Sequence, residues 1–337
     1  MTKHSSDEIT QRIWGCLMGV ACGDAMGMPT SLMSPETIRE IFPEYITEFQ
    51  PAPPGHPIHN NMVAGQITDD TQQSLLLADT IIATGRIDSQ DFAQRLIGWA
   101  ESNGAFNSLL VGPSSLRALH ALRSGASIEE SGTTGDTNGA TMRVSAAGIF
   151  GKGDLERTVD AVANACKPTH NTNIAIAGAS AVAIVIGAGI RGETDIDRLM
   201  ALARQAISLG MEQGNRWYGA SLTKRMDLAL NLVQDHRPKA EAMHDLYDTV
   251  GAGVATTETV PLCLSLVKMA DGDPVEAIRL ATNLGGDCDT TAAIAGGMCG
   301  AISGIQAFPE HWISTIESVN NLGLEHYAEQ LTSMIYD

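Results

Sequence analysis

NLGGDCDTTAAIAGGMCGAISG, residues 283–304, places Asp287 and Asp289 directly before a run of very small side chains. Alanine and glycine let helices approach one another closely, and residues 174–189, IAIAGASAVAIVIGAG, have the same character. We therefore predict two central helices that are buried on all sides. Alternation of apolar and polar residues over the length of a strand is scarce, and aromatic residues make up only 4% of the chain, which favours an all-α protein.

Other segments carry the signals of ordinary amphipathic helices. In DFAQRLIGWAES, residues 91–102, Phe92, Leu96 and Trp99 fall on one side of a helix. In DPVEAIRLATNL, residues 273–284, Asp273 is placed to cap a helix that opens with Pro274. No repeat, low-complexity tract or linker divides the chain, so we expect residues 1–337 to form a single domain.

Composition limits the partners and the compartment. The chain has 39 acidic and 21 basic residues, a formal net charge of -18, which disfavours binding to nucleic acid or to an anionic membrane. The cysteines form no C-x-x-C pair, the N-terminus lacks the pattern of a signal peptide, and no stretch offers about 18 uninterrupted apolar residues. We therefore expect a soluble, cytoplasmic protein with reduced thiols. No pattern in the sequence indicates an oligomeric state.

A second acidic pair opens another predicted helix. In ITDDTQQSLLLADTII, residues 67–82, Asp69 and Asp70 are flanked by threonines, and helix capping alone explains such residues at a helix start. The recurrence of the pattern at Asp287 and Asp289 favours a shared site, because four carboxylates in one poorly solvated pocket must either be protonated or bind cations. All-oxygen ligands suit Mg²⁺ or Mn²⁺ rather than zinc, so the hypothesis is a site for two divalent ions.

Several motifs together resemble one known family. GCLMGVACGDAMGMP (15–29), TDDT (68–71), NGATMR (138–143), the pair Thr169-His170 and residues 283–304 are similar, in this order, to the ADP-ribosylglycohydrolase family, which includes the dinitrogenase reductase-activating glycohydrolase. The resemblance implies a single domain of orthogonally packed helices with two magnesium or manganese ions. It also implies hydrolysis of an N- or O-glycosidic bond at the anomeric carbon of a ribose, in an ADP-ribosylated protein or small molecule.

The resemblance also assigns residues. The implied metal ligands are Thr68, Asp69, Asp70, Asp287, Asp289 and Thr290. The implied lining of the substrate cleft is Asn138, Gly139, Met142 and Arg143, with His170 near the ribose, whereas Asp24 is expected to orient the local structure. Two cations can hold a ribose diol and a water of lowered pKa, and Asp69 or Asp289 would accept the proton of that water, so we count Asp69, Asp70 and Asp289 as catalytic.

One departure bears on the substrate. Many members of the family have a glutamate where this chain has Ser31, and the next acid, Glu36, fits equally well in the capped first turn of a helix opened by Ser34 and Pro35. Only Arg143 is placed by a motif to meet a pyrophosphate in this acidic protein. A hydrolase of a smaller N-riboside is therefore an alternative, and so is a non-catalytic member that binds a metal or a nucleotide.

Three further patterns have plainer interpretations. Gly187, Gly189 and Gly192 match a dinucleotide-binding fingerprint, but the acidic residues after them would repel a pyrophosphate, so we reject a nicotinamide site. His56 and His59 lie in the proline-rich stretch 51–65, which we expect to form a loop at the surface or the rim of a cleft. Trp217 and Tyr218 are either a stacking surface for a base or sugar, or part of the core.

Overall fold

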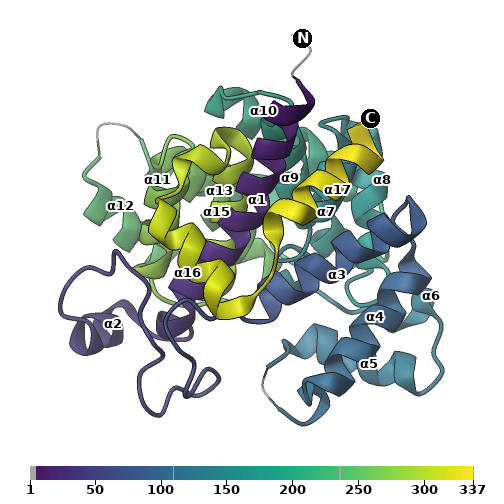
Figure 1. The fold of residues 1–337 in the computed structure, drawn as a ribbon, viewed down its shortest axis with the longest axis horizontal. Helices are drawn as coiled ribbons and strands as arrows, with labels where there is room; N and C mark the ends of the chain where they lie inside the picture. The colour runs from purple at the N-terminus through teal and green to yellow at the C-terminus, as the bar shows by residue number, and fades with distance from the viewer. Residues whose placement is uncertain (1–4, 109, 235–236, 337) are drawn as a thin grey trace.

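The computed structural model describes residues 5–108, 110–234 and 237–336, and its regular structure is helical (Figure 1). The β-type contacts within these ranges are isolated bridges, which confirms the all-α prediction. In chain order the α-helices are α1 (Ser6–Gly27), α2 (Pro35–Ile41), α3 (Asp69–Thr84), α4 (Ser89–Ser102), α5 (Pro113–Arg123), α6 (Ile128–Ser131), α7 (Ser145–Gly151), α8 (Leu155–Cys166), α9 (Asn173–Ile190), α10 (Ile196–Gly210), α11 (Leu222–Leu232), α12 (Lys239–Asp245), α13 (Thr256–Met269), α14 (Pro274–Thr282), α15 (Cys288–Ser303), α16 (Glu310–Asn320) and α17 (Leu324–Tyr336). Short 3-10 turns are η1 (Met28–Thr30), η2 (Ala105–Asn107), η3 (Asn138–Ala140) and η5 (Ile305–Ala307), and η4 (Leu246–Val250) is a π-helical turn.

Helices α1, α9 and α15 form the centre of the molecule, with the other helices around them (Figure 1). Every residue of α9 is buried, and α15 is buried from Cys288 to Ile302, so both predicted central helices are confirmed. By length and mean hydropathy α9 is also apolar enough to cross a membrane, although Asn173 and Ser180 interrupt its apolar residues, as the sequence analysis expects. Because the whole of this helix is covered by the rest of the protein, it is a core helix.

Helices α1 and α15 pack backbone against backbone. Every fourth residue of α1 from 15 to 27 is glycine, and this ridge faces small residues of α15. A Cβ atom on Gly19 would lie 2.1 Å from the carbonyl oxygen of Gly296, and one on Gly23 would lie 2.1 Å from that of Ala292. The sequence predicts close packing for α15, and the structure shows that its partner is the glycine ridge of α1.

Local signals predict several helix boundaries correctly. Asp273 caps α14 by accepting a hydrogen bond from the backbone N–H of Glu276, and Phe92, Leu96 and Trp99 are buried on one face of α4. Gly187 and Gly189 lie inside α9, so within the described chain they follow no strand, as the rejection of a nicotinamide site requires.

Two outlying groups flank the central helices. Helix α2 and the long loop after it lie on one side in the view of Figure 1, and helices α4 to α6 lie on the other. The loop runs back into the first turn of α3, and the segment before α15 contacts the chain just before α2. This arrangement brings the starts of α3 and α15 to the same part of the molecule.

Candidate active site

The start of α3 is fixed by a carboxylate from α1. Thr68 is the N-cap of α3, and both its backbone N–H and its hydroxyl donate to Asp24, the hydroxyl at 2.7 Å. Thr71 makes the same two kinds of hydrogen bond to Asp24. Burial raises the pKa of Asp24 to about 6, although these hydrogen bonds act in the opposite direction. Asp24 therefore orients the local structure, as expected.

The start of α15 is shaped by two glycines. Gly285 and Gly286 have φ angles of +98° and +82°, which residues other than glycine rarely adopt. A Cβ atom on Gly286 would lie 2.1 Å from the carbonyl oxygen of Ala252, whose oxygen accepts the backbone N–H of Asp287 at 2.7 Å. The carbonyl oxygen of Met33 accepts the backbone N–H of Gly286 at 2.8 Å. Asp287 is thereby held at the N-cap position of the helix that carries Asp289.

Acidic side chains from both helix starts line one cleft. The cleft has a volume of about 390 Å³, and its walls include Asp69, Asp70, Asp287 and Asp289. Burial, and then the charges of neighbouring carboxylates, raises the pKa values of Asp69, Asp70 and Asp287 well above the usual range for aspartate. One oxygen of Asp70, Oδ1, is buried without a hydrogen-bond partner. The cluster therefore holds more negative charge than the surrounding protein neutralises.

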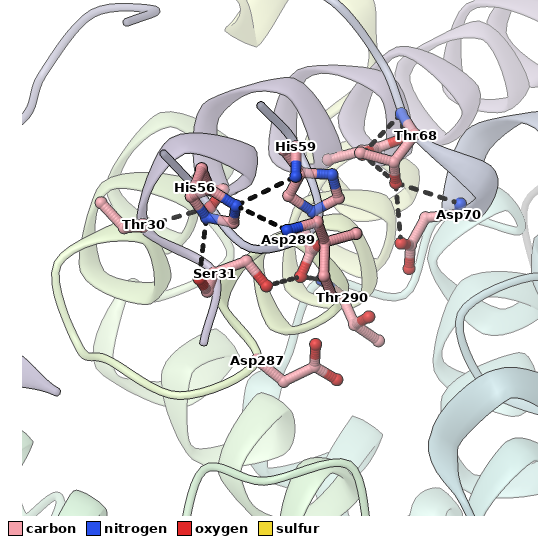
Figure 2. A network of polar contacts seen from close by, with 12 residues as sticks. Thr30, Ser31, His56, His59, Thr68, Asp70, Asp287, Asp289 and Thr290 are labelled. Carbon is pink, nitrogen blue, oxygen red and sulfur yellow. Dashed lines mark hydrogen bonds and ion pairs between the residues drawn. The ribbon is translucent and has the colours of Figure 1, made fainter. Parts of the chain in front are cut away.

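Asp289 differs from its neighbours because two side chains bind its carboxylate. The Ser31 hydroxyl donates to Oδ1 at 2.6 Å, and Nε2 of His59 lies 3.0 Å from Oδ2 (Figure 2). Burial alone would raise the pKa of Asp289, but the hydrogen bonds and the charge of this environment, led by His59, lower it to about 2. Asp289 is thus the carboxylate of the cluster that stays ionised.

The proline-rich loop forms part of this site. The sequence leaves open a loop at the surface or at the rim of a cleft; His56 and His59 are only 4% and 3% exposed and His59 lines the cleft, so the surface position is wrong and the position at the cleft fits. Nδ1 of His56 accepts the backbone N–H of His59 at 3.0 Å, which leaves its proton on Nε2 to donate to the carbonyl oxygen of Ser31 (Figure 2). His56 therefore joins the loop to the segment before α2, and His59 lines the cleft.

The whole chain matches proteins of one family. The family model described as ADP-ribosylglycohydrolase matches residues 5–337. The chain belongs to the ADP-ribosylglycohydrolase family. It is 37% identical over 96% of its length to a protein of Escherichia coli (strain K12), named only as uncharacterized protein YegU, and covers 96% of that protein. It is 27% identical over 92% of its length to the ADP-ribosyl-[dinitrogen reductase] glycohydrolase of Rhodospirillum rubrum, and covers 91% of that enzyme.

A solved structure shows the same fold. The structure of an ADP-ribosylglycohydrolase-related protein complex aligns with 97% of this chain and 99% of its own, with a TM-score of 0.74 at 23% identity. The fold of the ADP-ribosylglycohydrolase family thus spans the chain as one domain. Membership in a family of glycohydrolases makes hydrolysis the general chemistry of the site.

The structure brings most of the residues assigned by the resemblance to the cleft. Asp69, Asp70, Asp287, Asp289 and Thr290 line it, together with Asn138, Gly139 and Met142, and Thr68 lies directly beside it at the cap of α3. Asn138 donates to Oδ2 of Asp287 at 2.5 Å and to the hydroxyl of Thr259 at 3.0 Å. Asn138 therefore holds one carboxylate of the cluster in place.

Two assigned residues lie behind the cleft wall. Arg143 is 1% exposed and His170 is fully buried, and neither lines the cleft, so the expected direct contact with substrate does not fit their positions. Burial lowers the pKa of His170 well below its usual range, with Arg143 adding to the effect, and burial lowers the pKa of Arg143 to about 10. Arg143 hydrogen-bonds to Gln73 and Thr169, and His170 contacts Thr137 of the cleft wall, which gives both side chains an indirect role.

The remaining candidates lie elsewhere. Ser34 caps α2, and Glu36 pairs with Arg39 on the surface, so the capping interpretation of Glu36 is correct. Tyr218 is 80% exposed and stacks on Trp217, and neither lines the cleft. The functional residue missed by sequence reasoning is His59. Its only signal was a position nine residues before Thr68, in a loop that leads straight into the acidic helix start.

Proposed function

We propose that this protein is a glycohydrolase that uses two divalent cations, Mg²⁺ or Mn²⁺, to cleave the bond at the anomeric carbon of a ribose. The observation that carries the proposal is the cluster of buried carboxylates at the converging starts of α3 and α15, with one orphaned oxygen on Asp70. Burial and mutual repulsion raise the pKa values of these acids, which are the features of a functional-site candidate, and bound cations would neutralise the charge. The relative in Rhodospirillum rubrum, named as a glycohydrolase of an ADP-ribosyl compound, supports the same chemistry.

The donor set fits hard cations. Asp69, Asp70, Asp287 and Asp289 would hold the ions, with the hydroxyls of Thr68 and Thr290 as neutral donors. No group of three histidine, cysteine, aspartate or glutamate side chains in the described residues is already arranged around a single ion position. The carboxylates are instead turned to partners within the protein: Asp69 to Gln73, Asp287 to Asn138, and Asp289 to Ser31 and His59, while one oxygen of Asp70 lies 3.1 Å from the Thr68 hydroxyl. Loading would require Asp69, Asp70 and Asp287 to turn toward the cations, whereas Asp289 can keep Ser31 and His59, because each carboxylate oxygen has a second lone pair.

Two aspartates of the cluster have different roles in the proposed reaction. The bound ions would supply a water of lowered pKa and a template for the ribose diol. Both oxygens of Asp289 are engaged by Ser31 and His59, so this carboxylate is held ionised and in a fixed orientation. Among the described side chains only Gln73 donates to Asp69, at 2.9 Å on Oδ2, which makes Asp69 the freer carboxylate to accept the proton of the attacking water.

The residues that line the cleft favour a second candidate substrate, a smaller N-riboside. The cleft is lined by Pro57, Ile58, Leu110, Val111, Leu116 and Val254 in addition to its polar groups. None of the described lining residues is lysine or arginine, so the charges of a pyrophosphate would meet no cationic side chain there. This lining favours an N-riboside with an uncharged, partly apolar leaving group over an ADP-ribosyl compound. We also expect the protein to act in the cytoplasm.

One substrate panel tests the proposal. Metal-stripped protein is supplied with Mg²⁺ or Mn²⁺, and release of free sugar is followed from ADP-ribosyl-arginine, O-acetyl-ADP-ribose and simple nucleosides. Metal-dependent turnover of any of them supports the hydrolase, and a preference for nucleosides supports the second candidate. Binding of metal without turnover of any compound would favour a non-catalytic protein, and activity unchanged by chelators would contradict the role of the ions.

A further inference from the structure

A chain of buried hydrogen bonds joins Asp69 to Thr137, on another part of the cleft wall. It runs from α3 through the segment after η3 and the turn between α8 and α9. The contacts in order are Gln73 to Asp69 at 2.9 Å, Arg143 to Gln73 at 2.7 Å, Arg143 to Thr169, Thr169 to His170 at 2.8 Å, and His170 to Thr137 at 3.0 Å. All but Thr137 are buried, and Thr137 lines the cleft.

Arg143 sets the direction of these hydrogen bonds. A guanidinium has donors and no acceptor, so the carbonyl oxygen of the Gln73 side chain and the hydroxyl oxygen of Thr169 both accept from Arg143. The amide nitrogen of Gln73 is then left to donate to Asp69, as observed. Among the described residues no carboxylate hydrogen-bonds to this buried cation, and Asp69 is the carboxylate whose charge acts on the pKa of Arg143, after a larger effect from the Cys166 thiol. Arg143 therefore contributes to this network as a hydrogen-bond donor rather than as a member of an ion pair.

The same donor-to-acceptor direction fixes the tautomer of His170. Because the Thr169 oxygen accepts from Arg143, its own hydrogen needs an acceptor, and Nδ1 of His170 lies 2.8 Å away. The opposite tautomer would give the Thr169 oxygen two donors and leave its hydroxyl hydrogen unsatisfied in a site that is 1% exposed. His170 therefore carries its proton on Nε2 and donates it to the hydroxyl oxygen of Thr137.

The hydroxyl of Thr137 is the end of this network, on the cleft wall. Its oxygen is occupied by His170, and within the described chain no acceptor contacts its hydrogen. The backbone around it is fixed, since the Thr137 carbonyl accepts from the Thr256 hydroxyl at 2.9 Å and the next residue, Asn138, donates its N–H to Val254 at 2.8 Å. A donor held in place on the wall of a cleft, with no acceptor among the described residues, is free to bind a ligand.

We propose that Thr137 binds the substrate by donating a hydrogen bond to one of its oxygen or nitrogen acceptors, and that Arg143, Thr169 and His170 are positioning residues that fix this direction. The assignment of the ligand as a riboside rests on the proposed function. The tautomer of His170 is independent of the proposed function, because it follows from hydrogen bonds within the protein alone. His170 and Arg143 thus reach the substrate only through Thr137.

Binding measurements test the contact. Calorimetric titrations with ADP-ribose and with adenosine, each in the presence of Mg²⁺, are compared for the wild type, Thr137→Val and Thr137→Ser. Thr137→Val keeps the shape but lacks the donor, so at least one probe should bind about three- to tenfold more weakly, and Thr137→Ser should restore the affinity. Thr84→Val, at the exposed end of α3, is the matched control. Wild-type affinity of Thr137→Val for both probes would overturn the proposal.

A spectroscopic measurement tests the direction separately. Nitrogen-15 NMR of the histidine rings in ligand-free protein should show His170 neutral, with its proton on Nε2, and Thr169→Val should disturb that signal. A proton on Nδ1 would overturn the assignment. This measurement requires neither metal nor turnover, so a failed substrate panel would reject the proposed function while leaving the tautomer result intact.

Discussion

Nε2 of His59 lies 3.0 Å from Oδ2 of Asp289, and the side chains are 3% and 8% exposed. The two residues are 230 positions apart, and the contact attaches the proline-rich loop to the start of α15. Ser31 binds the other oxygen of the same carboxylate. Loss of the glutamate expected at position 31 therefore coincides with a serine and a histidine that together hold Asp289 ionised, which motivates the first prediction.

His59→Leu should weaken the binding of Mn²⁺ by about 10- to 100-fold, the usual effect of removing a residue that orients a metal ligand. His59→Gln keeps an N–H donor and should recover part of the affinity. Calorimetric titration of metal-stripped protein measures both variants. His326→Ala, on the exposed face of α17, is the control and should bind like the wild type. An unchanged affinity in His59→Leu would show that His59 does not orient a ligand of the ion.

Asp70→Asn and Asp287→Asn should each abolish metal-dependent activity and the rise in melting temperature on adding Mg²⁺ or Mn²⁺. The helices should persist in circular dichroism, because removing a charge from a crowded buried cluster relieves repulsion in the metal-free protein. Asp197→Asn removes an aspartate that is 81% exposed and should leave both properties intact. Full metal-dependent turnover in either cluster variant would count against the assignment.

The metal-free protein should lose stability as the pH rises. Asp69, Asp70 and Asp287 have pKa values raised in the folded state, and that of Asp24 is about 6, so the folded protein binds more protons than the unfolded chain above pH ~4. The stability linked to these protons is complete below pH ~4 and is lost as the pH rises through the folded-state values, by up to ~1.4 kcal/mol per pH unit for each group.

Thermal unfolding in a chelator at several pH values measures this dependence. Asp70→Asn should be less sensitive than the wild type, so its relative stability should increase from pH ~5 to pH ~8. Added Mg²⁺ should stabilise the wild type more at the higher pH, because cations and protons compete for the same oxygens. Parallel curves for wild type and variant would mean that Asp70 does not titrate in this range.

Gly23→Ala should destabilise the fold by about 3 kcal/mol, since its Cβ atom would lie 2.1 Å from the carbonyl oxygen of Ala292 and force α1 away from α15. Gly98→Ala makes the same change in α4, where a Cβ atom has no neighbour within 4 Å, and should be neutral or stabilising by up to ~1 kcal/mol. Melting temperatures of the two variants provide the comparison. Equal effects would mean that the glycine ridge is not needed for the close contact.

The sequence by itself determined the helical class, the buried character of α9 and α15, and the acidic starts of α3 and α15. These properties follow from composition, periodicity and capping, which act between residues close in the chain. It also carried the motifs by which the family is recognised, and it marked Ser31 as a departure from the family pattern.

Only the tertiary structure decided which side chains meet. His59 contacts Asp289, whereas Arg143 and His170 are buried behind the cleft wall that Thr137 lines. Both results depend on how the helices pack, because packing sets the path of each loop and the burial of each side chain. The glycine ridge of α1 acquires its meaning only when α15 lies against it. Local patterns state what each helix needs to bury, whereas the identity of the partner depends on distances and hydrogen-bond directions between segments that are remote in the chain.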